Sequence, residues 1–420
     1  MRYILRRSIT LGTAVGCVAV LSASVLAGDI PEREQFDTLL ARYDREPDGP
    51  GRERLAAQVD ALAHQKYATV SRLYWYVDFK SAVAAARAQG RPILHLRMLG
   101  RLDEELSCAN SRLFRTTLYA NRDVSEFLRE RFVLYWSSER PVPRVTIDYG
   151  DGRTIERTIT GNSAHYVLDE DGQPIDVLPG LYAPAVFRQE LERAASLAAR
   201  VRHQSADERA RLLADEHRQH VSAADHDWER LADVPGMSDL RKRLTQPRND
   251  TALVAAQRVT LSKMAVEIRD ARVIAKELAP EAPSAGEIEL WSTAGWRLYG
   301  IGGPQRSFSA SVLDAQSRAL VVRLHQAGTR PSSSGDEASD AMVARLEQTI
   351  AADTALNQLH VRPQISREIV RRAGRIDFAT LNAWIYDQVF RTPRQDPWLG
   401  LLQRDIFTGL PGDGVVFRSR

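Results

Sequence analysis

Cys108 and Ser111 are the residues of this chain whose types and spacing come closest to a reaction chemistry. They begin and end the tetrapeptide Cys108-Ala109-Asn110-Ser111, at the start of a helix predicted over 108–118. A cysteine at a helix N-terminus has its thiolate favoured by the helix dipole and by free backbone N–H groups. Such a thiolate can attack an exposed disulfide and form a mixed disulfide. Ser111 cannot resolve that adduct, because its alkoxide is inaccessible at neutral pH.

This spacing argues against a turnover dithiol oxidoreductase and leaves two interpretations open. In the first, which we favour, Cys108 is a structural residue of a binding or scaffolding module. In the second, the chain is a monothiol protein that performs thiol–disulfide exchange and holds partners as mixed disulfides. The accessibility of the thiol separates the two.

Three side chains allow a metal-binding interpretation as a second alternative. His95 lies on a predicted strand and His165 near another, and with Cys108 they would supply ligands that copper and zinc accept. Convergence of the three predicts a copper or zinc site. The competing interpretation, which we prefer, makes each histidine an ordinary core residue, and no cofactor is then predicted.

A second pair of histidines, His217 and His220, has the spacing that places two side chains on one helical face. Glu216 and His226 lie nearby, and the surrounding residues are nearly all charged. This pattern is typical of a solvated helix, so we expect these imidazoles to be exposed.

The segments that must position Cys108 alternate between helix and strand. Helical and alternating apolar periods follow one another, and Gly150-Asp151-Gly152 marks a hairpin turn. The predicted order is a helix over 78–89, a strand over 92–98, helices over 108–118 and 124–131, a strand over 132–136, hairpins over 144–160 and 165–178, and a helix over 185–199. This order predicts an α/β sandwich with a mixed sheet.

Residues 77–191 resemble the thioredoxin-like fold family in the order and spacing of short motifs. These motifs are Asp78-Phe79 opening a helix, Gly90-Arg91-Pro92 before an apolar strand, the Cys108–Ser111 tetrapeptide, Tyr119 eight residues later, Phe132-Val133 starting a strand, and a strand that turns at Asp169–Gly172. The resemblance implies a thioredoxin-like α/β domain with Cys108 at its active-site position.

The chain departs from that family in the acidic approach over 100–107, which replaces a Trp-Gly pair, and at two further positions. Ser111 replaces the second cysteine of the motif, and Ser163 stands where the family has a cis-proline. The resemblance therefore implies Cys108, Ser111 and Ser163 as the site residues of a degenerate Cys-x-x-Ser member. Its partners would be proteins, bound with or without a mixed disulfide at Cys108.

The rest of the chain is predicted to be mainly helical. We expect an N-terminal helical segment over 28–70, a thioredoxin-like domain over 71–200 and a helical domain over 201–420. Within the last, the patterns predict helices over 205–243 (broken at 235–236), 252–278, 341–359 and 378–390, a turn-rich junction at 295–303 and a flexible loop at 329–335. The tail, rich in Trp, Pro and Gly, includes Trp398 and follows Trp384; it is either a docking surface or a wrap over the helices.

The first 27 residues have the three-part build of a secretory signal. Three arginines in the first seven residues precede an apolar run over 9–26 that ends in small residues. We predict cleavage after Ala27 and a periplasmic or otherwise extracytoplasmic location. A retained membrane anchor and a lipoprotein modified at Cys17 are the alternatives, and Arg6-Arg7 is compatible with twin-arginine export.

Cleavage would leave a formally neutral chain with one thiol. The full sequence has 57 basic (Lys+Arg) and 54 acidic residues, and three of the basic residues belong to the leader. A neutral surface argues against nucleic acid and anionic membranes as partners, because both attract a basic excess. Cys108 would then have no intrachain disulfide partner, and no integral membrane span would remain.

Overall fold

The computed structural model describes residues 18–159, 161–246, 258–263, 284–301, 311–327, 335–392 and 398, with the backbone alone for 18–31 and 335–336. Within these ranges, no helix combines the length and the apolar character that crossing a membrane requires. Helix α1 (Val18–Arg45) continues through the predicted cleavage site after Ala27. The leader itself stays a prediction, because residues 1–17 lie outside the described ranges.

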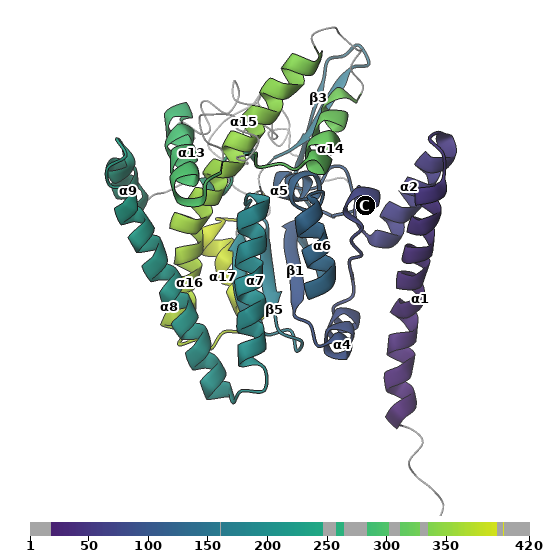
Figure 1. The fold of residues 1–420 in the computed structure, drawn as a ribbon, viewed down its shortest axis with the longest axis horizontal. Helices are drawn as coiled ribbons and strands as arrows, with labels where there is room; N and C mark the ends of the chain where they lie inside the picture. The colour runs from purple at the N-terminus through teal and green to yellow at the C-terminus, as the bar shows by residue number, and fades with distance from the viewer. Residues whose placement is uncertain are drawn as a thin grey trace, which may run out of the picture.

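A mixed sheet of four strands forms the centre of the fold (Figure 1). The strands are β1 (Ile93–Leu99), β2 (Val133–Arg140), β5 (Ala164–Leu168) and β6 (Pro174–Pro179), and they lie in the order β2-β1-β5-β6. β1 and β2 are parallel, whereas β5 is antiparallel to both β1 and β6. Each of these strands contains a run of buried residues, as expected for a sheet covered on both faces.

Helices flank this sheet at the places that the sequence predicts. They are α4 (Phe79–Gln89), α5 (Ala109–Leu113) with the π-helical turn η1 (Phe114–Leu118), α6 (Arg122–Arg131) and α7 (Pro184–Val201). Asp78 caps the N-terminus of α4 by accepting a hydrogen bond from the Ser81 backbone N–H. Gly90 ends the same helix in the left-handed conformation, with a φ of 62°. The prediction of a mixed α/β sheet with flanking helices is confirmed.

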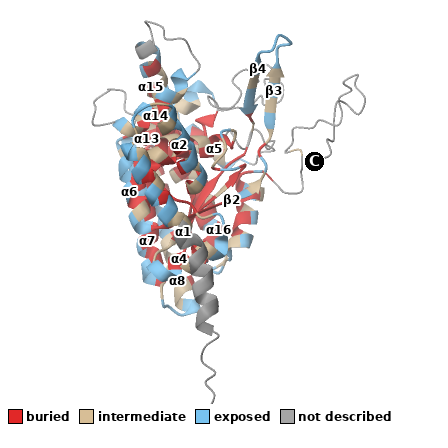
Figure 2. Ribbon diagram, turned by 90° about the vertical axis from the view of Figure 1, so that its right-hand side faces the viewer, coloured by how far each residue is buried: buried red, intermediate tan, exposed pale blue. Residues whose placement is uncertain are grey.

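A separate hairpin, β3 (Arg144–Asp148) and β4 (Thr154–Thr158), is inserted between β2 and β5. The predicted turn is present, with Gly150 and Gly152 at φ values of 74° and 89°. Figure 2 shows the two strands standing away from the body of the molecule, and most of their residues are exposed or half-buried.

The N-terminal helices form a small cluster at one side of the molecule (Figure 1). They are α1, α2 (Pro50–Ala63) and α3 (Ala68–Ser71). Phe36, Val59 and Tyr74 belong to a hydrophobic cluster separate from the main core. The chain breaks between α1, which ends at Arg45, and α2, which begins at Pro50.

The C-terminal region is helical and packs on the sheet domain. Its elements are α8 (Ala206–Arg230), α9 (Met237–Thr245), α13 (Ala285–Tyr299), α14 (Ala315–Gln326), α15 (Gly335–Leu356), the π-helical turn η3 (Asn357–Val361), α16 (Arg362–Arg371), α17 (Phe378–Trp384) and the π-helical turn η4 (Ile385–Val389). One continuous hydrophobic core joins these helices to the sheet. The division of the chain into domains at residue 200 stays a prediction.

Two predictions for this region are wrong, and two others fall mainly outside the described ranges. The predicted junction at 295–303 begins instead with the last turn of α13, which runs to Tyr299 and is closed by Gly300. A helix running through 252–278 is not continuous, because residues 260–262 are not helical. The rest of that segment lies outside the described ranges, as do residues 329–334 of the predicted loop and all of the tail after 392 except Trp398.

Gly295 is inside a helix because it lets two helices approach closely. A Cβ atom at this position would lie 2.5 Å from the Ala351 carbonyl oxygen of α15. We expect Gly295→Ala to lower the free energy of unfolding by about 1–3 kcal/mol, since helix backbones would have to separate. Gly286→Ala on the same helix is the matched control, because the nearest atom to its added Cβ is 3.9 Å away. Urea unfolding that ranks the two variants equally would contradict the close-approach explanation.

Candidate functional site

Cys108 lies at the N-cap of α5, after a loop that follows β1. Its side chain is fully buried. The loop is held by Arg115, whose buried guanidinium donates to the backbone carbonyl groups of Leu102, Glu104 and Glu105. The Arg115 side chain therefore stabilises the loop that precedes Cys108.

The structure brings the three predicted site residues, Cys108, Ser111 and Ser163, into one hydrogen-bonded group. The Cys108 sulfur lies 3.1 Å from the Ser163 Oγ and 3.5 Å from the Ser111 Oγ. Ser111 donates to the Ser107 Oγ, 2.6 Å away. All four side chains are fully buried. We call these four residues the thiol cluster, and within it the thiol already has hydroxyl partners.

The helical C-terminal region covers the loop that carries Ser163. Lys263 is fully buried and donates from Nζ to the Gly161 carbonyl oxygen and to the Asn162 Oδ1. The Tyr386 hydroxyl donates to the Asn162 carbonyl oxygen at 3.2 Å. No local signal in the sequence indicates this cover, because Lys263 and Tyr386 lie 102 and 224 residues away along the chain from the residues they contact. These contacts place protein over the end of the sheet where Cys108 lies.

Asp353 lies next to this cover and is itself buried. Its carboxylate accepts hydrogen bonds from the backbone N–H groups of Leu261 and Ser262. Burial raises the pKa of Asp353 to about 7, although these hydrogen bonds and the nearby Lys263 charge favour ionisation. Asp353 therefore fixes the short segment from which Lys263 projects.

The structure does not bring together the alternative metal ligands His95, Cys108 and His165. Directly opposed residues of antiparallel strands share a face of the sheet, and His95 is opposite Tyr166 whereas His165 is opposite Leu96. The two histidines therefore point to opposite faces. His95 Nε2 lies 2.7 Å from the Ser137 Oγ, and His165 Nε2 lies 2.6 Å from the Tyr119 hydroxyl. Both are core residues, which was the competing interpretation.

The prediction of solvated imidazoles at His217 and His220 is also wrong. His217 is 1% exposed, and the side chain of His220 is 14% exposed. Both lie on α8 against the edge strand β6, where Asp176 is 2% exposed. The candidate ligand atoms of Asp176, His217 and His220 all lie within 4.8 Å of one another. We call these three residues the histidine cluster. The nearby His226 has 77% of its side chain exposed.

A buried arginine borders the histidine cluster. Arg362, at the start of α16, donates to the Asp176 Oδ2 at 2.5 Å and to the Glu190 Oε2 at 2.7 Å. Burial opposes ionisation of Asp176, but the Arg362 charge outweighs it and lowers the pKa of Asp176 to about 2. Burial, followed by the Arg362 charge, lowers the pKa of His220 to about 3. Near neutral pH the cluster therefore holds a carboxylate and two neutral imidazoles.

The sequence could not reveal this cluster by spacing alone. His217 and His220 sit in a charged helix, and the residues that bury them come from β6 and α16, far away in the chain. Their i, i+3 spacing predicts that they share a helix face, but nothing in the predicted hairpin over 165–178 indicates that Asp176 lies beside them. The fold was needed to bring the carboxylate to the imidazoles.

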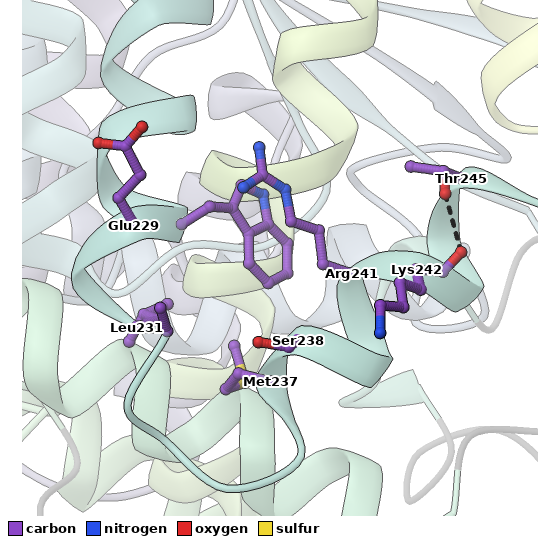
Figure 3. Close-up of a pocket in the computed structure, with 9 residues that line it drawn as sticks. Glu229, Leu231, Met237, Ser238, Arg241, Lys242 and Thr245 are labelled. Carbon is purple, nitrogen blue, oxygen red and sulfur yellow. Dashed lines mark hydrogen bonds between the residues drawn. The ribbon is translucent and has the colours of Figure 1, made fainter.

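A surface pocket of about 400 Å³ lies between the end of α8 and α9 (Figure 3). Leu231 and Met237 line it together with the Trp228 ring, and the Arg241 guanidinium carbon lies 5.5 Å from the centroid of that ring. Arg241 is also paired with Asp225 at 2.9 Å. The pocket therefore has an apolar floor and a cation that is already partly neutralised.

Comparison of the chain with protein-family models, with curated proteins and with solved structures gives no match. The structural class of the protein is therefore defined by its architecture alone. It is a mixed α/β protein in which a four-stranded sheet with flanking helices is joined to a helical C-terminal region.

Proposed function

We propose that the chain is an exported binding or scaffolding module built on a degenerate thioredoxin-like domain, in which the Cys108 thiol is structural. The observation that carries the proposal is the complete burial of Cys108 together with its hydroxyl contacts to Ser163 and Ser111. A thiol–disulfide exchange reaction needs the sulfur to reach another sulfur, so access limits it.

The order and pairing of the elements support the thioredoxin-like part of the proposal. Strand, helix, strand, antiparallel hairpin and helix follow one another in the order that the resemblance implies. The motif cysteine stands at the N-terminus of the helix after the first strand. The hairpin β3–β4 is an addition to that order.

Two features argue against exchange chemistry as the main activity. Ser111 cannot resolve a mixed disulfide, and the fully buried Cys108 sulfur could react only after a local opening of the fold. A monothiol exchange protein is the alternative, and it requires such opening. The exposed hairpin β3–β4 is instead a surface that a protein partner can reach without any rearrangement.

The reactivity of Cys108 tests the proposal. In a Cys17→Ser background, we expect the native protein to react with a disulfide reagent such as dithiobis(nitrobenzoate) about 100-fold or more slowly than the urea-unfolded protein, because reaction needs local opening. A Cys17→Ser/Cys108→Ser/Ser196→Cys variant supplies the reference for an exposed helical thiol, since Ser196 is exposed on α7.

The opposite result would favour the alternative function. If native Cys108 reacts as fast as the cysteine introduced at position 196, the thiol is accessible and the scaffold proposal fails. Reducible adducts of the protein in envelope extracts, absent from Cys108→Ser, would likewise identify a monothiol exchange protein. Export is tested separately by the mass of the recovered chain, which should begin at Gly28.

A further inference from the structure

The His220 imidazole has no hydrogen-bond partner within the part of the chain that the structure describes. Both ring nitrogens are buried and unpaired. The nearest acidic atom, the Glu216 Oε1, is 3.8 Å from Nε2, which is beyond hydrogen-bond distance. A buried polar group without a partner is rare in native proteins, and a missing ion is one of its ordinary explanations. His220 therefore points to a ligand that would use its lone pair.

The hydrogen bonds of His217 fix its tautomer, and they leave Nδ1 as the nitrogen that could bind an ion once the Ser366 hydroxyl turns away. Its Nε2 lies 3.2 Å from the Ile175 carbonyl oxygen, which can only accept, so Nε2 carries the proton and Nδ1 carries the lone pair. Nδ1 faces the Ser366 hydroxyl at 3.1 Å. A second ring nitrogen that donates to a backbone carbonyl is the common outer contact that fixes the tautomer of a metal ligand.

Asp176 retains a carboxylate oxygen for a further contact. Its Oδ2 is taken by Arg362, whereas Oδ1 accepts one hydrogen bond from the Val177 backbone N–H at 2.7 Å. A carboxylate oxygen has two lone pairs, so Oδ1 can accept a second contact. Arg362 keeps the carboxylate ionised and oriented, and its charge is balanced by Asp176 and Glu190 together.

We propose that the histidine cluster of Asp176, His217 and His220 binds one divalent transition-metal ion of the zinc class. Two imidazole nitrogens and one carboxylate oxygen suit Zn²⁺, Co²⁺, Ni²⁺ or Cu²⁺, whereas Mg²⁺ and Ca²⁺ prefer all-oxygen shells. Ligand atoms about 2.0–2.2 Å from one tetrahedral ion lie about 3.3–3.6 Å from each other. The separations of up to 4.8 Å in the cluster must therefore shorten by up to about 1.2–1.5 Å on binding.

The site would keep one coordination position for water or another small ligand. Three protein ligands leave the fourth position of a tetrahedral ion open. The exposed 14% of the His220 side chain gives the ion a short path from solvent. The neighbouring Arg362 charge disfavours a second cation, so binding is expected to be weaker than at a site without it.

The experiment uses the full chain, purified without a polyhistidine tag and stripped of metal with a chelator. Zn²⁺ is titrated calorimetrically, and Co²⁺ is added to a second sample to record its visible absorption. We expect one ion per chain, and a Co²⁺ spectrum with the intensity typical of a site of low coordination number. His220→Ala should weaken Zn²⁺ binding by about 100-fold or more, because even loss of an outer partner costs about 10–100-fold.

His226→Ala is the matched control, since His226 lies on the same helix but is exposed. It should bind Zn²⁺ like the wild type. His220→Ala is expected to fold normally, because no hydrogen bond to its ring is lost, and the circular dichroism of the metal-free variant checks this. Should it unfold, His217→Gln provides the second test.

The proposal is overturned if the wild type binds no Zn²⁺, if His220→Ala binds it as tightly as the wild type, or if His226→Ala abolishes binding. The first two outcomes would leave the cluster with a purely structural role, and the third would place the binding site elsewhere. If the wild type binds Zn²⁺, Cys108→Ser should bind it equally well, so this test is independent of the function proposed for the thiol cluster.

Discussion

Replacement of Arg362 by methionine is expected to lower the free energy of unfolding by about 3–5 kcal/mol at neutral pH. Arg362 is 3% exposed, and its guanidinium joins Asp176 on β6 to Glu190 on α7. Methionine fills most of the volume but leaves two buried carboxylates without a counter-charge. Unfolding in urea with a chelator present, at pH 7, measures the loss.

The pH dependence of that loss follows from the sign of the pKa shift. The Arg362 charge lowers the pKa of Asp176 to about 2, so the wild type keeps this stabilisation above the unfolded pKa of about 3.9 and loses it only as the pH falls towards 2. Without Arg362, burial alone acts and raises the pKa of Asp176. The penalty of Arg362→Met should therefore be smaller at pH 4 than at pH 7.

Two further variants give this prediction its control and its rescue. Arg211→Met removes an exposed i, i+3 ion pair with Glu208 and should change stability by less than about 1 kcal/mol. Addition of Asp176→Asn and Glu190→Gln to Arg362→Met should recover part of the loss, because no buried charge then remains unpaired. If Arg362→Met is no more harmful than Arg211→Met, the buried ion pairs do not stabilise the fold.

Local sequence signals are sufficient to predict the helices and strands of the sheet domain. Asp78 indicates the start of a helix because its side chain accepts a hydrogen bond from a free backbone N–H, and Gly90 indicates its end because glycine adopts the left-handed conformation there. Gly150-Asp151-Gly152 indicates a hairpin because a tight turn needs residues with positive φ. These rules act over a few residues. They fail at Gly295, where the same lack of a side chain serves helix packing instead of a turn.

The candidate sites depended on contacts between distant segments. Cys108, Ser111 and Ser163 come together in the structure. The contacts of Lys263 and Tyr386 to residues 161–162 have no local signal in the sequence. A charged helix predicts solvent-exposed imidazoles at His217 and His220, and this prediction is wrong because β6 and α16 pack against one side of α8. The burial of one face of a charged helix such as α8 depends on tertiary contacts, so only the three-dimensional structure reveals it.

A large pH effect of a single histidine is expected at His165. This residue is fully buried on β5, with the Phe114 and Phe187 rings at centroid distances of 4.6 and 4.8 Å. Burial lowers the pKa of His165 from 6.5 to about 3. The folded state therefore holds the ring neutral at pH 5, whereas the unfolded chain protonates it below about 6.5.

The sign of the linkage is that the unfolded state binds the extra proton, so stability falls as the pH falls below 6.5 and continues to fall towards pH 3. Between pH 7 and pH 5 this histidine alone should remove about 2 kcal/mol. Asp353, whose pKa burial raises to about 7, acts in the opposite direction over the same range. The total slope therefore mixes several groups, and a difference between variants is needed to isolate His165.

His165→Gln supplies that difference, because an amide can still hydrogen bond to the Tyr119 hydroxyl, now 2.6 Å from Nε2. We expect the loss of unfolding free energy between pH 7 and pH 5 to be about 2 kcal/mol smaller in His165→Gln than in the wild type. His226→Gln, at an exposed position, should leave the loss unchanged. Equal losses in the wild type and His165→Gln, measured in urea with a chelator, would mean that the folded protein accommodates a charged imidazole at this position. The neutral, aromatic-lined core described around β5 would then have to admit a proton and its water.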